Sequence, residues 1–144
     1  MTTVAQILKH KGRRIVSLRP AESVADAARL LNREGIGAVL ARDPNGRVAG
    51  IISERDIVRA VAQHGERALA MSVAECMTRD VIFCAPHESI DRVMSMMTER
   101  RFRHLPVQER GDLVGIISIG DVVKYRIDET EMEAQALRQY IATG

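Results

Sequence analysis

The sequence predicts an α+β fold made of two copies of one β-α-β-β-α unit. The main observation is a phrase that occurs twice, GIISERDIVRAV at residues 50–61 and GIISIGDVVKYR at residues 115–126. A second observation is that similar helix and strand patterns surround both phrases in the same order, and such repetition is typical of a duplicated structural unit. A unit of about 60 residues buries only about 60% of its unfolded surface. The length of 144 residues therefore predicts that the two units share one core.

The repeated phrase has a spacing of 65 residues. Its shared residues are Gly50, Ile51, Ile52, Ser53, Asp56 and Val58, which recur as Gly115, Ile116, Ile117, Ser118, Asp121 and Val123.

A capped amphipathic stretch precedes the phrase in each copy. Ser23–Leu31 predicts a helix that ends near Gly35, and Ser89–Met97 predicts one that ends near Arg101. These two helices are 66 residues apart, one more than the phrases. The additional residue is expected in Asp43–Gly46, because the sequence DPNG favours a tight turn.

Short apolar segments predict three strands in each copy. They are Ile15–Leu18, Ala38–Ala41 and Val48–Ile52 in the first copy and Val81–Cys84, Leu105–Gln108 and Leu113–Ile117 in the second. We expect the first unit to cover residues 8–66, the second residues 73–130, and a C-terminal helical extension residues 131–144.

Three helical segments are expected outside this pattern. Val4–His10 forms a short helix, and Ser72 caps another that leads to Met77. After Asp121 the last helix continues along a stripe with 3,4 spacing: Val123, Ile127, Thr130, Ala134, Leu137 and Ile141. The stripe packs either on the chain's own body or against a second protomer, and the sequence favours neither.

Composition excludes several classes of function. A net charge of +2 with only 3% aromatic residues argues against nucleic-acid binding. No apolar run reaches the roughly 18 residues needed to span a membrane, and the N-terminal residues do not resemble a signal peptide. We therefore expect a cytoplasmic protein. Cys76 and Cys84 lack the spacing of a metal site, which predicts buried thiols and no bound metal.

The repeated GIIS-x-x-D motif, the segment Arg103–Val107 and the pair Met77–Thr78 together resemble a stand-alone CBS-domain pair, or Bateman module. This resemblance covers nearly the whole chain. It implies two units packed face to face through their sheets with pseudo-twofold symmetry. It also implies two clefts for an adenosine-containing small molecule (AMP, ADP, ATP, S-adenosylmethionine or NAD) and a homodimer that acts on an unidentified protein target.

The Ser-x-x-Asp pairs have two interpretations. Each can be a capping box at the start of a helix. Each Asp can also accept hydrogen bonds from both ribose hydroxyls of a nucleoside, while the helix N-terminus beside it attracts phosphate. Because the pair occurs twice, the sequence favours ligand binding. Gly50 and Gly115 either admit a ligand close to the backbone or allow a bend in the strand.

By the same resemblance, each cleft joins the Asp of one copy to the segment before the first strand of the other. The Asp56 cleft takes Gly37, Ala38, Ser53, Asp56, Thr78, Arg79, Asp80 and Val81. The Asp121 cleft takes Gly12, Arg13, Arg14, Ile15, Arg103, His104, Ser118, Gly120 and Asp121.

The basic side chains around Asp121 predict a phosphate site. Arg13, Arg14, Arg103 and His104 are suited to holding phosphate beside a helix N-terminus. The alternative is a solvated basic face, which we favour for the neighbouring residues 100 and 101.

The expected function is a regulatory sensor of AMP, ATP or NAD(H) that is not an enzyme. The alternative is a ligand-independent dimerisation or interaction module. The chain has no P-loop, and Gly35-Ile36-Gly37 lacks the third glycine of a dinucleotide fingerprint.

Overall fold

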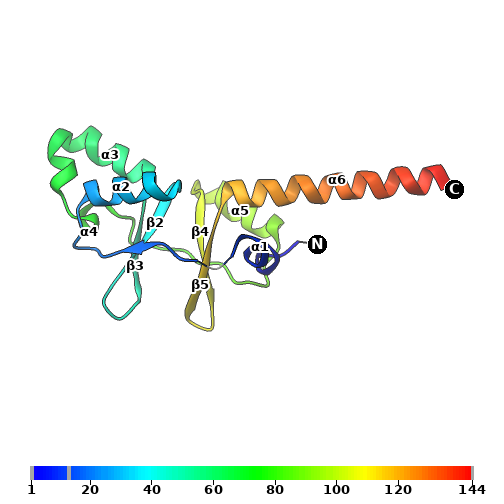
Figure 1. Ribbon diagram of the computed structural model, residues 1–144, viewed down its shortest axis with the longest axis horizontal. Coiled ribbons are helices and arrows are strands. Elements are labelled where there is room, and N and C mark those ends of the chain that lie inside the picture. Colours follow the sequence, from blue (N-terminus) through cyan, green and yellow to red (C-terminus); the bar gives the residue numbers. More distant parts are fainter. Residues whose placement is uncertain (1, 13, 144) are drawn as a thin grey trace. The chain divides into compact units, whose positions relative to one another are not determined.

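The computed structural model describes residues 2–12 and 14–143, and it divides the chain into two compact units (Figure 1). The central unit is Val16–Val81, and the terminal unit combines Met1–Ile15 with Ile82–Gly144. The expected domain boundaries followed the sequence repeat. The compact units instead group residues 8–15 with the second copy of the repeat, because the N-terminal helix packs there.

The central unit contains a three-stranded sheet in the order β1-β2-β3. β1 (Ser17–Leu18) pairs in parallel with β2 (Ala38–Arg42), and β2 pairs antiparallel with β3 (Val48–Ser53). The helical elements are α2 (Val24–Glu34), α3 (Glu54–His64), the 3₁₀ helix η1 (Gly65–Ala70) and α4 (Val73–Cys76).

The terminal unit contains an antiparallel pair of strands, β4 (His104–Glu109) and β5 (Asp112–Ser118). Its helices are α1 (Val4–Lys11), α5 (Ile90–Arg100) and α6 (Ile119–Thr143). The strand expected at Val81–Cys84 is reduced to one parallel bridge between Cys84 and Val107. The backbone there forms only two ladder bonds, from Cys84 N to Pro106 O and from Gln108 N to Cys84 O.

Serine caps begin the helices where the sequence predicted them. Ser23, Ser53 and Ser72 each accept a hydrogen bond from the backbone N–H three residues later, and the acidic side chain at that position bonds back. α2 ends at Gly35 with φ 65°, and α5 ends at Arg101 with φ 58°. Both helices therefore close with a left-handed residue, although only the first copy uses glycine.

Each unit has its own cluster of buried apolar side chains, where the chain length had predicted one shared core. Leu31, Val39 and Ile52 lie in the cluster of the central unit. The cluster of the terminal unit includes Leu105 and Ile117, and α1 contributes Val4, Ile7 and Leu8. α1 and α4 thus supply apolar surface beyond the repeated unit, which allows each copy to close a core of its own.

Among the residues that the structure describes, no helix combines the length and apolarity needed to cross a bilayer. The same residues contain no group of three or more His, Cys, Asp or Glu side chains that could hold a metal ion.

Candidate functional site

The two repeated Asp residues lie in the first turns of α3 and α6, each bonded to the serine that ends the preceding strand. Ser53 N donates to Asp56 Oδ2 at 2.9 Å, and Asp56 N donates to Ser53 Oγ at 3.2 Å. Ser118 N and Asp121 N make the same two bonds, at 2.9 and 3.2 Å. The capping interpretation is therefore correct for both pairs. Capping does not exclude ligand binding, because a carboxylate has about four acceptor positions and capping uses only some of them.

Asp56 is nearly buried, with 7% of its surface exposed. Its Oδ2 also accepts from Ser53 Oγ at 3.0 Å. Its Oδ1 accepts from Thr78 Oγ1 at 3.3 Å and from Arg59 at 3.4 Å. The structure thus brings Asp56 and Thr78 together as predicted, but it satisfies Asp56 with protein donors.

Asp121 is more open and faces a cation from α1. The Lys11 ammonium donates to Asp121 Oδ2 at 2.6 Å, and the exposed fractions of the two side chains are 37% and 25%. The same ammonium donates to the carbonyl of Ile116 at 2.9 Å. The predicted site did not include Lys11.

Lys11 does in the terminal unit what Thr78 does in the central unit. Thr78 N donates to the Ile51 carbonyl at 2.8 Å, while its hydroxyl bonds Asp56. Ile51 and Ile116 are equivalent in the repeat, so both segments bond the same carbonyl and the same carboxylate. The first site uses a neutral hydroxyl, whereas the second uses a flexible positive charge.

The repeated glycines explain how these segments come so close to the strands. A Cβ at Gly50 would lie 2.6 Å from Met77 Sδ and 2.8 Å from the Thr78 carbonyl oxygen. A Cβ at Gly115 would lie 2.6 Å from Leu8 Cδ2. The glycines therefore provide space for a neighbouring protein segment in both units.

The local charges hold Asp121 in its ionised form. Partial burial by itself would raise the pKa of Asp121, but the hydrogen bonds from Lys11 and Ser118 outweigh this effect. The pKa of Asp121 therefore lies below its ordinary value of 3.8. An ionised carboxylate accepts hydrogen bonds only, as recognition of a ribose diol requires.

Arg103 and His104 adjoin the Ser118–Asp121 turn. Ile119 N donates to the Arg103 carbonyl at 2.8 Å, and His104 pairs with Ser118 across the strands. Gly120 is exposed at the start of α6, where an added Cβ would lie 3.6 Å from Ser118 Oγ and would fit.

Residues 12, 14 and 15 follow α1 in the same unit, and Gly12 ends that helix with its N–H bonded to Leu8 O. Arg14 is exposed, whereas Arg13 lies outside the described residues.

The corresponding positions of the central unit are less basic. Glu54 N donates to the Gly37 carbonyl at 3.0 Å, and Ala38 pairs with Ser53. Arg79 donates to the Ala74 carbonyl at 2.9 Å, so its guanidinium bonds α4. The two residues that follow it are Asp80, which is exposed, and Val81, whose N–H donates to the Arg79 carbonyl.

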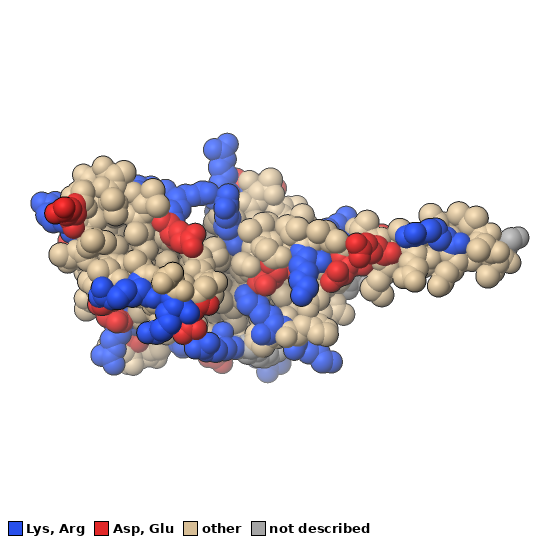
Figure 2. Space-filling model, turned by 45° about the horizontal axis from the view of Figure 1, so that its top comes forward, with Lys and Arg blue, Asp and Glu red and all other residues tan. Residues whose placement is uncertain are grey.

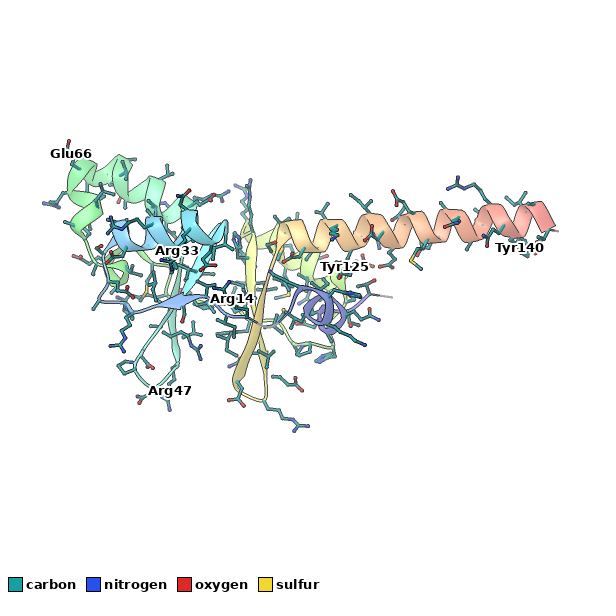
Figure 3. The ribbon with its side chains drawn as sticks, in the orientation of Figure 1. Arg14, Arg33, Arg47, Glu66, Tyr125 and Tyr140 are labelled. Atoms are coloured by element: carbon teal, nitrogen blue, oxygen red, sulfur yellow. The ribbon has the colours of Figure 1, made fainter. Side chains whose placement is uncertain are left out.

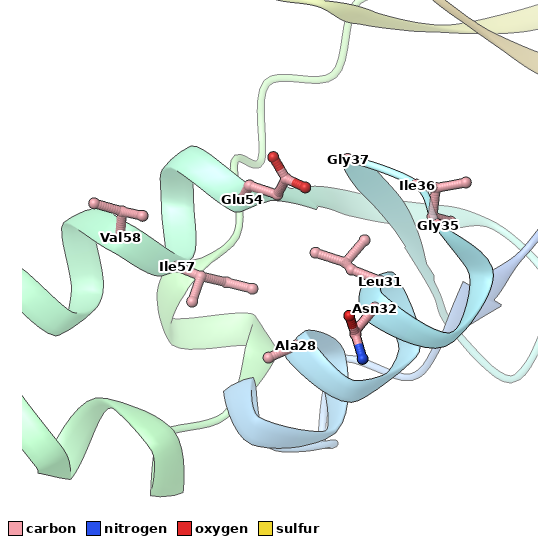
Figure 4. Close-up of a pocket in the computed structure, with 9 residues that line it drawn as sticks. All are labelled: Ala28, Leu31, Asn32, Gly35, Ile36, Gly37, Glu54, Ile57 and Val58. Carbon is pink, nitrogen blue, oxygen red and sulfur yellow. The ribbon is translucent and has the colours of Figure 1, made fainter.

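A cavity of about 550 Å³ lies between α2 and α3 in the central unit (Figure 4). Its lining comprises Ala28, Leu31, Asn32, Gly35, Ile36, Gly37, Glu54, Ile57 and Val58. Gly37 is the one residue of the predicted site among them. The lining is largely apolar and carries an acidic residue at the start of α3, so this cavity is poorly suited to a phosphate.

Lys11 was not predicted as a site residue, because the segment assigned to the Asp121 cleft began at Gly12. The signal that would have revealed it is the basic run HKGRR, which begins in the last turn of α1, near the position that the repeat makes equivalent to Thr78.

Comparison with known proteins gives consistent matches. A family model of the CBS domain matches residues 4–63 and 73–128. The crystal structure of the CBS-domain-containing protein ATU1752 from Agrobacterium tumefaciens is 48% identical, with a TM-score of 0.86 over 87% of this chain and 99% of that one. The CBS-domain pair of MJ0100, in complex with 5′-methylthioadenosine and S-adenosyl-L-methionine, is 27% identical, with a TM-score of 0.79 over 90% of this chain and 98% of that one. The mitochondrial CBS-domain-containing protein CBSX3 from Arabidopsis thaliana is 32% identical over 99% of this chain and 73% of its own length.

Proposed function

The chain belongs to the CBS-domain family, as its repeated motif predicted, and on this premise we propose that it is a regulatory protein that binds an adenosine-containing ligand at Asp121. The observation that carries the proposal is an ionised, partly exposed carboxylate in the first turn of a long helix, with basic residues beside it. The complex of MJ0100 with two adenosine compounds supports this ligand class.

Ligand recognition begins at the carboxylate. The two ribose hydroxyls donate to Asp121, and a charge-assisted hydrogen bond of this kind is stronger than a neutral one. The Lys11 ammonium occupies part of the same acceptor space, so the ligand displaces it from Oδ2. The displaced ammonium remains within reach of the site on its flexible side chain, where it can meet a phosphate.

Phosphate recognition favours the terminal unit. The first turn of α6 carries one acidic residue, Asp121, whereas the first turn of α3 carries both Glu54 and Asp56. A helix N-terminus attracts anions through its free N–H groups and its dipole, and adjacent carboxylates weaken this attraction. We therefore propose that AMP, ATP or NAD(H) binds at Asp121, with Arg103 and His104 beside the phosphate, and that the Asp56 site binds more weakly.

The proposed output is regulation without catalysis. Binding stabilises the ligand-bound form of the unit, and the chain passes this change to a protein target as a homodimer. A second candidate function is a ligand-independent interaction module. The observation that favours it is that protein donors bond both Asp residues, through Thr78 in one unit and Lys11 in the other.

Isothermal titration calorimetry with adenosine, AMP, ATP and NADH tests the proposal. The variant Asp121→Asn keeps the shape of the side chain but removes its charge, and we expect affinity to fall roughly ten- to 150-fold. The variant Asp56→Asn should change the main binding event much less. The control is Asp128→Asn, an exposed acid further along the same helix.

Unchanged affinity in Asp121→Asn would refute the ribose contact. Absence of binding by all four compounds, together with native mass spectrometry that finds no copurified nucleotide, would favour the interaction module.

A further inference from the structure

The second half of α6 extends past the rest of its own unit (Figure 1). Residues 131–143 are all exposed, and at 1.5 Å per residue they form about 20 Å of helix without packing partners in the unit. The two tyrosines mark the change along the helix (Figure 3). Tyr125 packs on the core of the unit, with its ring centroid 6.0 Å from that of His10, whereas Tyr140 is exposed. An isolated helical segment as short as residues 131–143 is marginally stable in water. We therefore expect these residues to pack against a partner.

The apolar positions of α6 follow a heptad. Ile127, Ala134 and Ile141 occupy one core position (a), and Val123, Thr130 and Leu137 occupy the other (d). Ile127, Leu137 and Ile141 are 52%, 60% and 68% exposed. The Thr130 hydroxyl donates to the Arg126 carbonyl at 2.9 Å, so its polar group is satisfied within the helix and the residue can join an apolar seam.

The charged residues beside the seam are complementary to a second copy of the same helix. In a parallel pair, position g of one helix faces position e of the next heptad in the other. This rule pairs Arg126 with Glu131 of a second copy and Glu133 with Arg138 of a second copy. Figure 2 shows acidic side chains along the middle of α6 and one basic patch nearer its end, where Arg138 is the one Lys or Arg that follows Arg126 in the sequence.

Glu133 and Arg138 are the main evidence that the partner is a second copy of α6. Neither residue has an opposite charge three or four positions away in its own helix, so their signs have no intrahelical explanation. Arg126 bonds Asp91 in its own unit at 3.0 Å. Its charge therefore has a partner within the unit, and it is weaker evidence for pairing between two copies of α6.

We infer that α6 pairs with α6 of a second copy as a parallel two-stranded coiled coil over residues 123–141. The inference is independent of nucleotide binding. The seam has only six core positions, two of which are Thr130 and Ala134, so the association is weak and depends on protein concentration.

Charge exchange between two variants tests both the partner and the orientation. Glu133→Arg alone and Arg138→Glu alone each place like charges across the seam, and sedimentation should show roughly tenfold weaker dimerisation in each case. An equimolar mixture of the two variants restores both opposite pairs, so it should form heterodimers with nearly wild-type affinity. Asp128→Arg is the matched control, because it makes the same change of charge outside the seam.

Two results would overturn the inference. One is that both variants, alone and mixed, dimerise like the control. The other is that backbone hydrogen exchange of residues 131–143 is slow and independent of protein concentration, because this would place the stripe against the chain's own body. Substitution of Leu137→Glu should abolish the pairing, whereas Met132→Glu, on the opposite side of the helix, should not.

Discussion

Lys11 Nζ lies 2.6 Å from Asp121 Oδ2, so a cation from the N-terminal helix already bonds the carboxylate that the repeat presents for a ligand. The equivalent Asp56 meets the hydroxyl of Thr78 at 3.3 Å. The two sites therefore differ in charge although their motifs match, and most of the expected experimental differences between them arise from this contact.

The ion pair should make stability depend on pH. Because the pKa of Asp121 is lower in the folded state than its ordinary value, the contribution is present at neutral pH and is lost as pH falls below about 4. Lys11→Met should cost about 1 kcal/mol or less at pH 7, because both groups are partly exposed. Urea unfolding at pH 7 and pH 3 should show this difference shrinking in acid. Lys9→Met on the same helix is the control, and a difference that is equal at both pH values would contradict the prediction.

Lys11 should also influence the choice of ligand. In Lys11→Met, the ribose hydroxyls no longer compete with an ammonium, so adenosine should bind more tightly than in the wild type. AMP should gain less or lose affinity, because a cation available to its phosphate is missing. Calorimetry gives the ratio of AMP to adenosine affinity, which should fall severalfold in the variant. A ratio that does not change would exclude a phosphate contact by Lys11.

Removal of the two Asp side chains should have unequal effects on folding. Asp56→Ala leaves several donors without their buried acceptor, including Thr78 and the Ser53 N–H, and should cost about 3 kcal/mol. Asp121→Ala leaves an ammonium that can reach water, so the loss should be nearer 1 kcal/mol, the usual cost of losing a cap. Chemical denaturation measures both changes, and equal losses would show that the environments do not differ as described.

The repeated glycines should tolerate a methyl group to different degrees. Gly50→Ala forces the added atom against the Thr78 carbonyl oxygen, which cannot move without shifting the backbone, and should cost about 3 kcal/mol. Gly115→Ala meets only the end of the Leu8 side chain and should cost about 1 kcal/mol. In a double-mutant cycle, Gly115→Ala should lower the free energy of unfolding by less in the Leu8→Ala background than in the wild type. Additive losses would rule out this contact as the cause.

The two thiols should react at very different rates. Burial raises the pKa of Cys84 to about 12, with a smaller effect from the nearby Glu88 carboxylate, and the thiolate is the reactive form. Cys76 is partly exposed, and burial raises its pKa as well. Maleimide labelling of the folded protein at pH 8 should therefore modify Cys76 first, and Cys84 only upon unfolding. Cys76→Ser should be nearly inert when folded, and equal labelling of both thiols would be inconsistent with the buried position of Cys84.

The sequence determined the elements and the family. The serine caps, the spacing of apolar residues and the repeated motif are local signals, and each has a direct structural consequence within a few residues of the chain. For this reason α2, α5, the two hairpins and the capping role of Asp56 and Asp121 were predictable. The strand expected before α5 was less predictable, because four apolar residues do not specify whether a full ladder forms.

Only the tertiary structure decided what completes each site. Lys11 and Asp121 are 110 positions apart, and they meet because Leu8 of α1 packs over Gly115 and brings the end of the helix to the Ile116 carbonyl. The sequence shows a glycine at both equivalent positions but not which segment uses the space. That choice depends on the packing of α1 on one unit and of residues 77–78 on the other. As a result, one carboxylate is nearly buried beside a hydroxyl, and the other is partly open beside a charge.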